Sequence, residues 1–576
     1  MKAVINFLSK YICEWILIIC LALSISFQSG DNNLKMIIRA DGIGYYSYLP
    51  AMFIYSDYQF SFMHKMQAKY NEAQYDGGYL SPTPYGKVNK YYIGQSILWL
   101  PFFLIAHGIS LLVGDPDGYS FFYQLIVMVA SSFYLWLGCR YLRKLFMDYS
   151  TPPPTIALIL LAIVFGTNLI NYATVDVWAT HVSSFGMISV FIYMCHSFFK
   201  EQTAKKLYII AIVFALIALL RPTNAVVGLF FLYFATSFKA LSEAIKRNKM
   251  AFLMAILLFL LVGSTQLFMN YAEVGHFFIW AYGEEQFVFS DPQIFNVLFS
   301  YRKGLFVYAP LILIAIAGVL KLFKENRFQA SVAFLFLAIS TYVISSWECW
   351  WYGGSLGQRS FVDYYGVFAL LLLFFYNWIS KKAILKYTFL ITVPLLIVYS
   401  SVLSYQYGHY ILHWDYMTKE RFWYVFMKTD KQYTGVVWSQ AFFDDKYPRN
   451  FIALQATSTG TYVGAKNNET DFLSAWSDKT WSWETFNAID VGSNKVALYT
   501  FGGSFVKVST DPQRLSFLKY EPSELKNAEG FSMIESDNKT VFLKAANNKY
   551  VRIKADSLLA DAESINAAER FRLIKK

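Results

Sequence analysis

The sequence predicts a polytopic α-helical membrane protein with a C-terminal all-β domain. The chain has 576 residues, is 56% hydrophobic and has a mean hydropathy of +0.35, which is too apolar for a soluble globular protein. Apolar segments long enough to cross a bilayer recur up to residue 405. Beyond residue 450 the long apolar runs stop and an internal repeat begins. We therefore expect a membrane domain over 1–405, a linker over 406–449 and a β domain over 450–576.

Twelve segments have the length and apolarity of membrane-spanning helices. They are 11–28, 93–113, 119–142, 154–172, 178–199, 205–220, 223–239, 250–269, 304–322, 329–346, 360–379 and 385–404. The first, "YICEWILIICLALSISF", could also be a signal peptide. It carries Glu14 and lacks a clear small-x-small cleavage site, so we expect a retained transmembrane helix.

Charge sorts the loops between these segments into two sets. The loops "CRYLRKLF", "FKEQTAKK", "FKALSEAIKRNK", "KLFKENR" and "SKKAILK" are basic, whereas the intervening loops hold most of the Trp, Gly and Asp. Lys and Arg of membrane proteins gather in cytoplasmic loops, so we place the basic set in the cytoplasm. The net charge of +11 is explained in this way, and we expect no nucleic-acid partner.

One segment conflicts with this alternation. If all twelve segments crossed, the basic loops could not all share a side with Lys2 and Lys10. The conflict disappears if 93–113, "IGQSILWLPFFLIAHGISLLV", does not cross. Pro101 and His107 within this run favour a broken or re-entrant pair of half-helices. We therefore predict about eleven spans plus this re-entrant or juxtamembrane segment, with the N-terminus in the cytoplasm and the C-terminus outside.

The C-terminal region contains a threefold repeat with a spacing of 40 to 45 residues. Each copy has an early Leu, then an aromatic residue followed by Val, and closes with Glu-x-Phe-x-x-Ile. The copies begin with Leu454, Leu498 and Leu543 and close at Ile489, Ile534 and Ile574. Short strands and turn residues repeated three times resemble a β-trefoil of the fascin-like type; a generic β-sandwich is the alternative. Such a domain could bind or orient an acceptor, or serve only as a spacer.

The stretch "RADGIGYYSYLP" follows the first apolar segment. Its acid, Asp41, precedes Gly42 and Gly44, and glycine permits a bend and the close approach of backbone or substrate. Tyr45 and Tyr46 add amphipathic surface that suits substrate binding. Asp41 is a candidate general base at the membrane interface, or alternatively a solvated cap of the helix that follows.

A second aromatic cluster lies in "SSWECWWYGGSLGQRSFVDYYG", residues 345–366. Trp350 and Trp351 stand beside several glycines and precede Arg359. Trp rings stack on sugar faces, and Arg binds phosphate through a fork of donors. An aromatic belt with a snorkelling Arg is the alternative, but a belt does not explain the glycines.

Two further cations occupy the predicted outer face. Arg221 in "LLRPTN" ends an apolar segment, and Arg302 in "YRKGLF" precedes another. Positive charge on this face opposes the positive-inside trend, which an anionic ligand would explain; snorkelling is the alternative. Lys90 in "GKVNKYYIGQS" lies at the entry to the proposed re-entrant segment.

The segment "NYATVDVWATHVSSF" places Asp176 and His181 at the start of another predicted span. Ionisable residues near membrane depth are costly and tend to be functional, although a single His in a helix can also simply pack. With the preceding residues, they predict carboxylates and cations around the outer mouth of the bundle. Such a site suits a phosphate-bearing amphiphile whose tail stays in lipid and whose head is a sugar.

Residues 1 to about 405 resemble the C-type glycosyltransferase (GT-C) superfamily of protein mannosyltransferases and aminoarabinose transferases. The resemblance rests on "RADGIGYYSYLP", "KYYIGQSILWLPFFLIAH", "LLRPTN", "YRKGLF" and "WECWWYGGSLGQR". It implies a catalytic acid in the first outer loop, which corresponds to Asp41, and a second acidic position that resembles Asp176. It also implies outer-face basic residues that hold the lipid phosphate, for which Arg221, Arg302 and Arg359 are the candidates.

The sequence departs from this superfamily in two ways. The chain has Asp41-Gly42-Ile43 where protein mannosyltransferases have Asp-Glu and oligosaccharyltransferases have a metal-binding Asp-x-Asp. Because the second acid of Asp-x-Asp is absent, we expect no metal and no other cofactor. The five cysteines are scattered without metal-type spacing, so we also expect no disulfide framework. The trefoil-like region is C-terminal, whereas protein mannosyltransferases carry a trefoil inside a loop.

These features together predict an enzyme of the bacterial cytoplasmic membrane, with its C-terminal domain in the periplasm. It is expected to transfer a sugar from a polyprenyl-phosphate donor to a glycan, lipid or protein acceptor, with inversion and with Asp41 as general base. The alternative is a glycolipid transporter or receptor with a lectin-like trefoil. The paired internal repeats common in transporters are not evident in the membrane part of the sequence.

Overall fold

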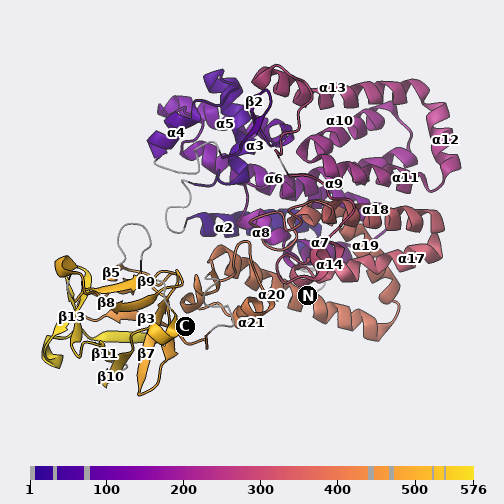
Figure 1. The fold of residues 1–576 in the computed structure, drawn as a ribbon. Helices are drawn as coiled ribbons and strands as arrows, with labels where there is room; N and C mark the ends of the chain where they lie inside the picture. Colours follow the sequence, from indigo (N-terminus) through magenta and orange to yellow (C-terminus); the bar gives the residue numbers. More distant parts are fainter. Residues whose placement is uncertain are drawn as a thin grey trace. The chain divides into compact units, whose positions relative to one another are not determined.

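Apolar segments of the sequence fold as helices, and the repeat region folds as strands (Figure 1). The computed structural model of the chain describes residues 7–29, 36–70, 78–283, 285–438, 447–465, 472–514, 516–521, 524–536 and 540–576. The chain divides into two compact units, Met1–Ser404 and Tyr405–Lys576.

In the residues that the structure describes, the first unit is helical apart from one hairpin. Its α-helices are α2 (Ile12–Gln28), α3 (Asp41–Pro50), α4 (Met63–Tyr70), α5 (Gly94–Val113), α6 (Phe121–Asp148), α7 (Pro153–Phe165), α8 (Leu169–Thr174), α9 (His181–Lys200), α10 (Ala204–Leu220), α11 (Leu229–Ala235), α12 (Phe238–Arg247), α13 (Lys249–Val274), α14 (Ile294–Phe299), α15 (Leu305–Tyr308), α16 (Leu311–Ile316), α17 (Gly318–Glu325), α18 (Arg327–Ser345), α19 (Tyr365–Ile379) and α20 (Ala383–Gly408), which runs into the second unit. Shorter turns are the π-helix η2 (Ala51–Tyr55) and the 3-10 helices η4 (Pro222–Gly228) and η5 (Arg359–Tyr364). The hairpin pairs β1 (Leu80–Thr83) with β2 (Gly86–Asn89).

Helix α9 lies at the centre of the helical unit. It packs against α6, α10, α11 and α19, and nearly all of its residues are buried. Helices that are apolar on every face are typical of the interior of a bundle. A Cβ built on Gly186 would lie 2.6 Å from the carbonyl oxygen of Tyr134, so this glycine allows α9 and α6 to cross closely. The core therefore forms around a helix that begins at His181, beside the predicted site.

Seven helices in the described part of the chain are long and apolar enough to cross a membrane, or eight if a bent pair counts as one span. The seven are α5, α6, α9, α13, α18, η5 together with α19, and α20. The bent pair is Pro222–Ala235 with Phe238–Arg247, which meet at 94°. Segment 154–172 is divided into α7 and α8, and segment 304–322 into α15, α16 and α17. The unit has the helices of a multi-pass membrane protein, and the count of eleven spans stays a prediction.

The expected break in segment 93–113 does not occur, and that part of the prediction is wrong. Helix α5 is continuous from Gly94 to Val113 with Pro101 inside it. Pro101 comes in the second turn and its side chain is exposed, so its ring points away from the packed face. Proline removes one backbone donor, which a helix supported by neighbours tolerates.

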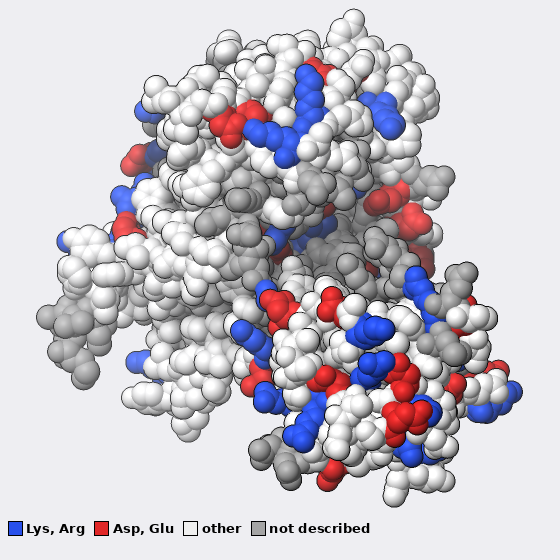
Figure 2. All heavy atoms as spheres, turned by 90° about the vertical axis from the view of Figure 1, so that its left-hand side faces the viewer, with Lys and Arg blue, Asp and Glu red and all other residues white. Residues whose placement is uncertain are grey.

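Large apolar side chains are exposed on several of these helices. Leu112 on α5 is 90% exposed and Ile384 on α20 is 81% exposed. Helix α13 buries only 17% of its most apolar window. On the face drawn in Figure 2, charged side chains gather in patches and leave broad areas without Lys, Arg, Asp or Glu. Extensive exposed apolar surface is typical of helices that face lipid.

The second unit is all-β after a short helical start. Helix α21 (Lys419–Val425) and the 3-10 turns η6 (Lys431–Tyr433) and η7 (Val436–Trp438) precede the strands. The predicted linker 406–449 thus falls within this unit, and its residues 439–446 lie outside the described residues. The strands are β3 (Phe451–Ala456), β4 (Tyr462–Gly464), β5 (Ser474–Ser477), β6 (Phe486–Asp490), β7 (Lys495–Thr500), β8 (Phe505–Val508), β9 (Leu518–Glu521), β10 (Phe531–Ser536), β11 (Thr540–Lys544), β12 (Tyr550–Lys554), β13 (Ser557–Ala562) and β14 (Phe571–Lys575).

Each copy of the sequence repeat supplies four of these strands. The first and last strand of each copy pair with each other, as β3 with β6, β7 with β10, and β11 with β14. Pairs between copies join β6 to β7, β10 to β11, and β14 to β3. These six pairings close a ring of antiparallel strands. The middle strands of each copy pair as three hairpins, β4–β5, β8–β9 and β12–β13.

The repeated residues explain how this ring is held together. The early Leu, the Val after the aromatic residue and the Phe of the closing motif have 0% to 1% exposure in all three copies. These nine residues are Leu454, Val463, Phe486, Leu498, Val506, Phe531, Leu543, Val551 and Phe571. The repeat is therefore a packing pattern that fills one shared apolar core.

Candidate functional site

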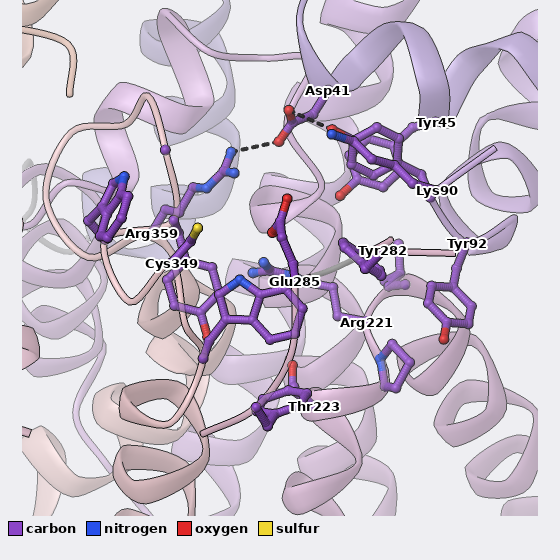
Figure 3. Close-up of a pocket in the computed structure, with 18 of the residues that line it drawn as sticks. Asp41, Tyr45, Lys90, Tyr92, Arg221, Thr223, Tyr282, Glu285, Cys349 and Arg359 are labelled. Atoms are coloured by element: carbon purple, nitrogen blue, oxygen red, sulfur yellow. Dashed lines mark hydrogen bonds and ion pairs between the residues drawn. The ribbon is translucent and has the colours of Figure 1, made fainter. Parts of the chain in front are cut away.

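A cavity of about 320 Å³ opens among the loops at one end of the helical unit (Figure 3). Its wall combines the start of α3, the residues after β2, the end of α10, the segment between α13 and α14, and the loop between α18 and η5. The residues that line it are Asp41, Tyr45, Lys90, Tyr91, Tyr92, Leu220, Arg221, Pro222, Thr223, Trp280, Tyr282, Glu285, Phe287, Trp347, Cys349, Trp351, Tyr352, Gly353 and Arg359. The wall therefore mixes cations, carboxylates and aromatic rings.

Asp41 reaches this wall because of the turn that starts α3. Ala40 adopts a positive φ of 49°, and Asp41 is the first residue of the helix, where a negative charge is favoured by the helix dipole. A Cβ on Gly42 would lie 2.7 Å from the Cβ of Trp178, and a Cβ on Gly44 would lie 2.2 Å from the ring of Tyr91. The two glycines of the motif thus let α3 pack tightly and bring the Tyr91 ring beside Asp41.

The Asp41 carboxylate is held by two partners. Its Oδ1 accepts a hydrogen bond from the Tyr91 hydroxyl at 2.7 Å, and its Oδ2 accepts one from the Arg359 guanidinium at 2.8 Å. Burial raises the pKa of the Asp41 carboxyl, but the charge of Arg359 and the hydrogen bonds from Tyr91 and Arg359 outweigh burial and lower that pKa below its ordinary value. Asp41 is therefore an ionised carboxylate at neutral pH.

A second ion-pair network positions Arg221. Asp363 lies 3.8 Å from the Arg221 guanidinium and accepts a hydrogen bond from the Asn224 amide at 2.7 Å. His181 Nδ1 lies 2.7 Å from the other oxygen of Asp363. Asp363 and His181 are buried and do not line the cavity. They act on the site through Arg221, whose guanidinium they anchor at its wall.

The structure brings six of the predicted site residues to one cavity. These are Asp41, Tyr45, Lys90, Arg221, Trp351 and Arg359. The Lys90 ammonium lies over the Tyr91 ring at 5.3 Å, and no described residue forms an ion pair with it. Lys90 is thus a cation whose charge can be matched by an anionic ligand.

Five predicted site residues do not line the cavity. Tyr46 is buried and donates its hydroxyl hydrogen bond to the Gly118 carbonyl at 2.7 Å, so it ties α3 to the turn before α6. Arg302 stacks over Trp351 at 3.8 Å and over Trp350 at 5.8 Å, and so lies behind a ring that does line the cavity. His181 acts through Asp363, as described above.

Asp176 also lies behind the wall. Its carboxylate accepts a hydrogen bond from Asn171 at 3.0 Å and lies 4.0 Å from the Arg39 guanidinium. Burial raises the pKa of the Asp176 carboxyl, and the charges of Arg39 and Arg359 only partly oppose this effect. Its surroundings thus differ from those of Asp41, which has the closer cation and the lowered pKa.

Sequence reasoning missed the wall formed by residues 280–287. Trp280, Tyr282, Glu285 and Phe287 line the cavity, and Trp347 packs its ring against three of these rings. The available signal was the density of aromatic and acidic residues in "FFIWAYGEEQF", which lies between the predicted spans 250–269 and 304–322. Tyr91 was missed as well, although it follows Lys90 directly.

Among the described residues, no three His, Cys, Asp or Glu side chains form a group that could hold a metal ion. The chemistry available at this wall is that of two carboxylates, several cations and aromatic faces. A scan against protein-family models found no family that matches the chain, and a search of curated proteins found none that matches either.

Proposed function

We propose that the chain is an integral membrane glycosyltransferase that uses a polyprenyl-phosphate-linked sugar as donor. The observation that carries this proposal is the convergence of Asp41, Lys90, Arg221 and Arg359 with aromatic rings in one cavity. These residues come from segments up to 318 positions apart in the chain. A carboxylate beside several cations and aromatic faces suits a substrate that has a phosphate, a sugar and an attacking hydroxyl.

The proposed reaction proceeds with inversion at the anomeric carbon. Asp41 takes the proton from an acceptor hydroxyl as its oxygen forms a bond to that carbon. The bond between the anomeric carbon and the phosphate oxygen breaks, and polyprenyl phosphate leaves with the electron pair. Arg221, Lys90 and Arg359 stabilise the charge of this leaving group. No metal has a step in this scheme.

We further propose that the first unit is a GT-C fold with eleven spans and that the second is a β-trefoil. The closed ring of six strands and the three hairpins, one set of four strands per repeat, support the trefoil. The second unit would bind or orient an acceptor glycan, lipid or protein on the periplasmic side of a bacterial cytoplasmic membrane.

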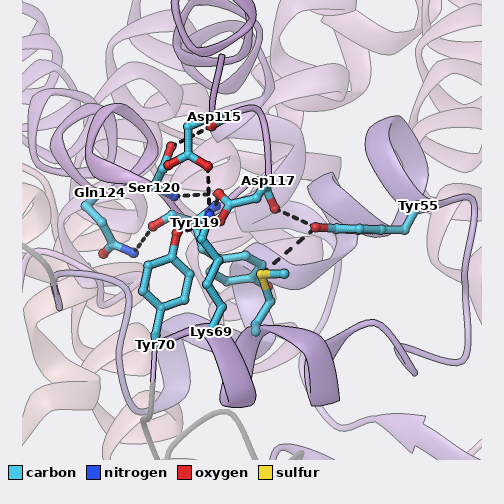
Figure 4. A network of polar contacts seen from close by, with 9 residues as sticks. Tyr55, Lys69, Tyr70, Asp115, Asp117, Tyr119, Ser120 and Gln124 are labelled. Atoms are coloured by element: carbon cyan, nitrogen blue, oxygen red, sulfur yellow. Dashed lines mark hydrogen bonds and ion pairs between the residues drawn. The ribbon is translucent and has the colours of Figure 1, made fainter. Parts of the chain in front are cut away.

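Contacts at the C-terminal end of α5 support the proposal that this helix lies along the membrane surface. Lys69 on α4 donates hydrogen bonds at 2.7 Å to both Asp115 and Asp117, which directly follow α5 (Figure 4). The Tyr55 hydroxyl donates to the Asp117 carbonyl at 2.9 Å. The start of α5 is tied to the same outer loop, since Tyr48 donates to the Tyr91 carbonyl at 2.8 Å. Both ends of α5 thus contact the segment that precedes it, as a juxtamembrane helix would.

Replacing Asp41 tests the proposal. A strain lacking the gene should accumulate a polyprenyl-phosphate monosaccharide, measured by mass spectrometry, and the wild-type gene should restore turnover. Asp41→Asn keeps the shape of the side chain but removes the base, so turnover should fall by roughly 10²–10⁴-fold. The variant protein should still be produced and should still bind citronellyl phosphate, a short isoprenoid phosphate.

Asp291→Asn provides the matched control, because Asp291 is exposed and does not line the cavity. It should restore turnover fully. Full activity of Asp41→Asn would remove Asp41 as the base. Binding of citronellyl phosphate by a wild-type protein whose loss changes no glycoconjugate would instead favour a transporter or receptor.

A further inference from the structure

Glu285 is a second carboxylate of the cavity, and its position is fixed by the backbone around it. Its amide donates to the Tyr282 carbonyl at 3.1 Å. The next residues form a short antiparallel bridge to the loop after α18, with Glu348 N donating to Gln286 O at 3.0 Å and Val288 N donating to Ser346 O at 2.6 Å. Figure 3 shows the Glu285 carboxylate directed toward the part of the cavity where Asp41 and Arg359 lie.

The two carboxylates of the cavity differ in what they contact. Asp41 accepts hydrogen bonds from Tyr91 and Arg359. The Glu285 carboxylate has no ion pair and no hydrogen bond with any described residue. The oxygens of a carboxylate accept hydrogen bonds, so Glu285 can accept them from the donors of a ligand or of water.

Four aromatic rings line the same cavity as Glu285. The Trp347 ring lies 4.8 Å from Phe287, 5.5 Å from Tyr282 and 6.4 Å from Trp280, measured between centroids. All four rings line the cavity. A sugar ring offers C–H groups that pack on aromatic faces and hydroxyls that donate hydrogen bonds, so this wall meets both requirements.

The charges of the cavity favour one assignment of the donor's two parts. The cations Lys90, Arg221 and Arg359 suit the phosphate, whereas a phosphate beside Glu285 would place two like charges together without a cation paired to Glu285. An uncharged, hydroxyl-bearing sugar does not meet this repulsion.

We propose that Glu285 determines sugar specificity by accepting hydrogen bonds from hydroxyl groups of the donor sugar, which stacks on the Trp280–Trp347 wall. This inference rests on the proposed function. It assigns the binding of the donor sugar to the Glu285 side of the same cavity. It predicts that the donor carries a neutral sugar and that Glu285 contributes to binding only when that sugar is present.

Binding of two kinds of probe separates the sugar from the phosphate. One probe is citronellyl phosphate, and the other is a panel of its diesters with glucose, mannose, galactose and arabinose. Affinities are measured for the full chain in nanodiscs, because sugar-headed detergents would compete. At least one diester should bind the wild-type protein roughly tenfold or more tightly than citronellyl phosphate, as expected for hydrogen bonds to a charged acceptor.

Glu285→Ala should remove this advantage and lower the affinity for that diester by roughly 10- to 100-fold. The affinity for citronellyl phosphate should stay within about twofold of the wild-type value. Glu285→Gln keeps an acceptor oxygen and should retain part of the advantage. Unchanged citronellyl phosphate binding also shows that the variants are folded. Glu348→Ala is the matched control, because Glu348 lies on the bridged loop, is exposed and does not line the cavity.

The outcomes distinguish this inference from the proposed function. If citronellyl phosphate does not bind the wild-type protein, the proposed lipid-phosphate donor is wrong. If it binds but no neutral-sugar diester binds more tightly, or if Glu285→Ala preserves the advantage, the role of Glu285 is wrong while the proposed function stands.

Discussion

Both oxygens of Asp41 are hydrogen-bonded within the protein, one to Tyr91 and one to Arg359. A base with a lowered pKa is fully ionised but has a weak affinity for a proton. Arg359 is also one of the cations proposed to bind the donor phosphate. When a phosphate shares the charge of Arg359, the affinity of Asp41 for a proton rises. The same guanidinium can thus couple donor binding to the strength of the base.

The Arg359 pair predicts the pH dependence of transfer. The pKa of Asp41 lies below its ordinary value of 3.8, so the carboxylate stays ionised, and the ion pair stays intact, as pH falls until that lowered pKa is reached. The acid limb of kcat/KM should therefore lie below the ordinary Asp range. Arg359→Gln removes the charge that lowers the pKa of Asp41, so burial should raise this pKa and move the acid limb to higher pH. The substitution should also slow transfer.

Initial rates in membranes that contain the endogenous donor, measured from about pH 3 to pH 9, provide this profile. Arg359→Lys keeps the charge and should hold the limb closer to its wild-type position. An acid limb that is identical in the wild type and in Arg359→Gln would show that Asp41 is not the titrating group.

Cys349 offers a chemical probe of the cavity wall. It lines the cavity and is partly exposed, whereas the other four cysteines are buried. N-ethylmaleimide should therefore modify Cys349 first and block transfer, because the adduct occupies a cavity of only about 320 Å³. Citronellyl phosphate should slow the modification about tenfold or more at saturation.

The measurement is the rate of loss of activity together with the mass of the labelled protein. Cys349→Ala is the control and should stay active in the presence of the reagent. Equal inactivation of this variant would mean that the reagent acts at another site.

The sequence predicted the kinds of side chain at the site better than the individual residues that form it. The sequence pointed to Asp41, Arg221 and Arg359 because a charged residue at the predicted outer end of an apolar segment is costly and therefore tends to have a function. The same reasoning selected Asp176 and His181, which lie one layer behind the wall. Burial and hydrogen-bond partners decide between these positions, and neither can be read from a sequence. Glu285 was missed although "FFIWAYGEEQF" is dense in aromatic and acidic residues, because the residue lies within a loop and not at the end of an apolar segment, where the charges were sought.

At the scale of elements, hydropathy located the helices well but not their continuity. Segment 154–172 breaks at Gly166 between α7 and α8, whereas Pro101 does not break α5. Local propensity disfavours proline in a helix, but packing by neighbouring elements decides whether the helix continues. The repeat predicted short strands in three copies because its Leu, Val and Phe recur at fixed positions, and those residues fill one core. The number of four strands per copy came only from the structure.

The polar network around Lys69 is predicted to fasten α4 to the turn after α5. Lys69 bonds Asp115 and Asp117, and the Asp117 carboxylate also accepts from the backbone N–H of Tyr119 and Ser120 at 2.8 Å (Figure 4). Lys69→Ala leaves the half-buried Asp117 without its cation and should destabilise this attachment by about 0.5–1 kcal/mol, because the partly exposed pair is screened by solvent. Amides of α4 should then exchange hydrogen faster.

Hydrogen exchange followed by mass spectrometry measures this effect for peptides that cover α4. Lys65→Ala on the same helix is the matched control, because Lys65 is exposed and no described residue pairs with it. Exchange that is equally fast in both variants would show that the network does not hold α4.

At the scale of the whole molecule, sidedness follows from one assumption about α5. If the other eleven predicted segments cross and α5 does not, the first outer loop, the cavity and the β unit are all predicted to face outward, and the basic loops to face the cytoplasm. If α5 crosses, every later segment changes side. The contacts that Lys69 makes with Asp115 and Asp117 favour the first arrangement, because they join the end of α5 to a helix that precedes it.

Single cysteines in a Cys349→Ala background test this arrangement with a membrane-impermeant maleimide. Tyr85→Cys at the β1–β2 turn, Asp115→Cys after α5 and Ser564→Cys in the β unit should be labelled from outside, since all three positions are exposed. Lys205→Cys and Lys381→Cys in the basic loops should react only after the membrane is permeabilised. Labelling of Tyr85→Cys from outside but of Asp115→Cys only from inside would show that α5 spans the bilayer. Arg359 would then lie on the opposite face from Asp41, which the ion pair between the two at 2.8 Å does not allow without a further re-entrant segment.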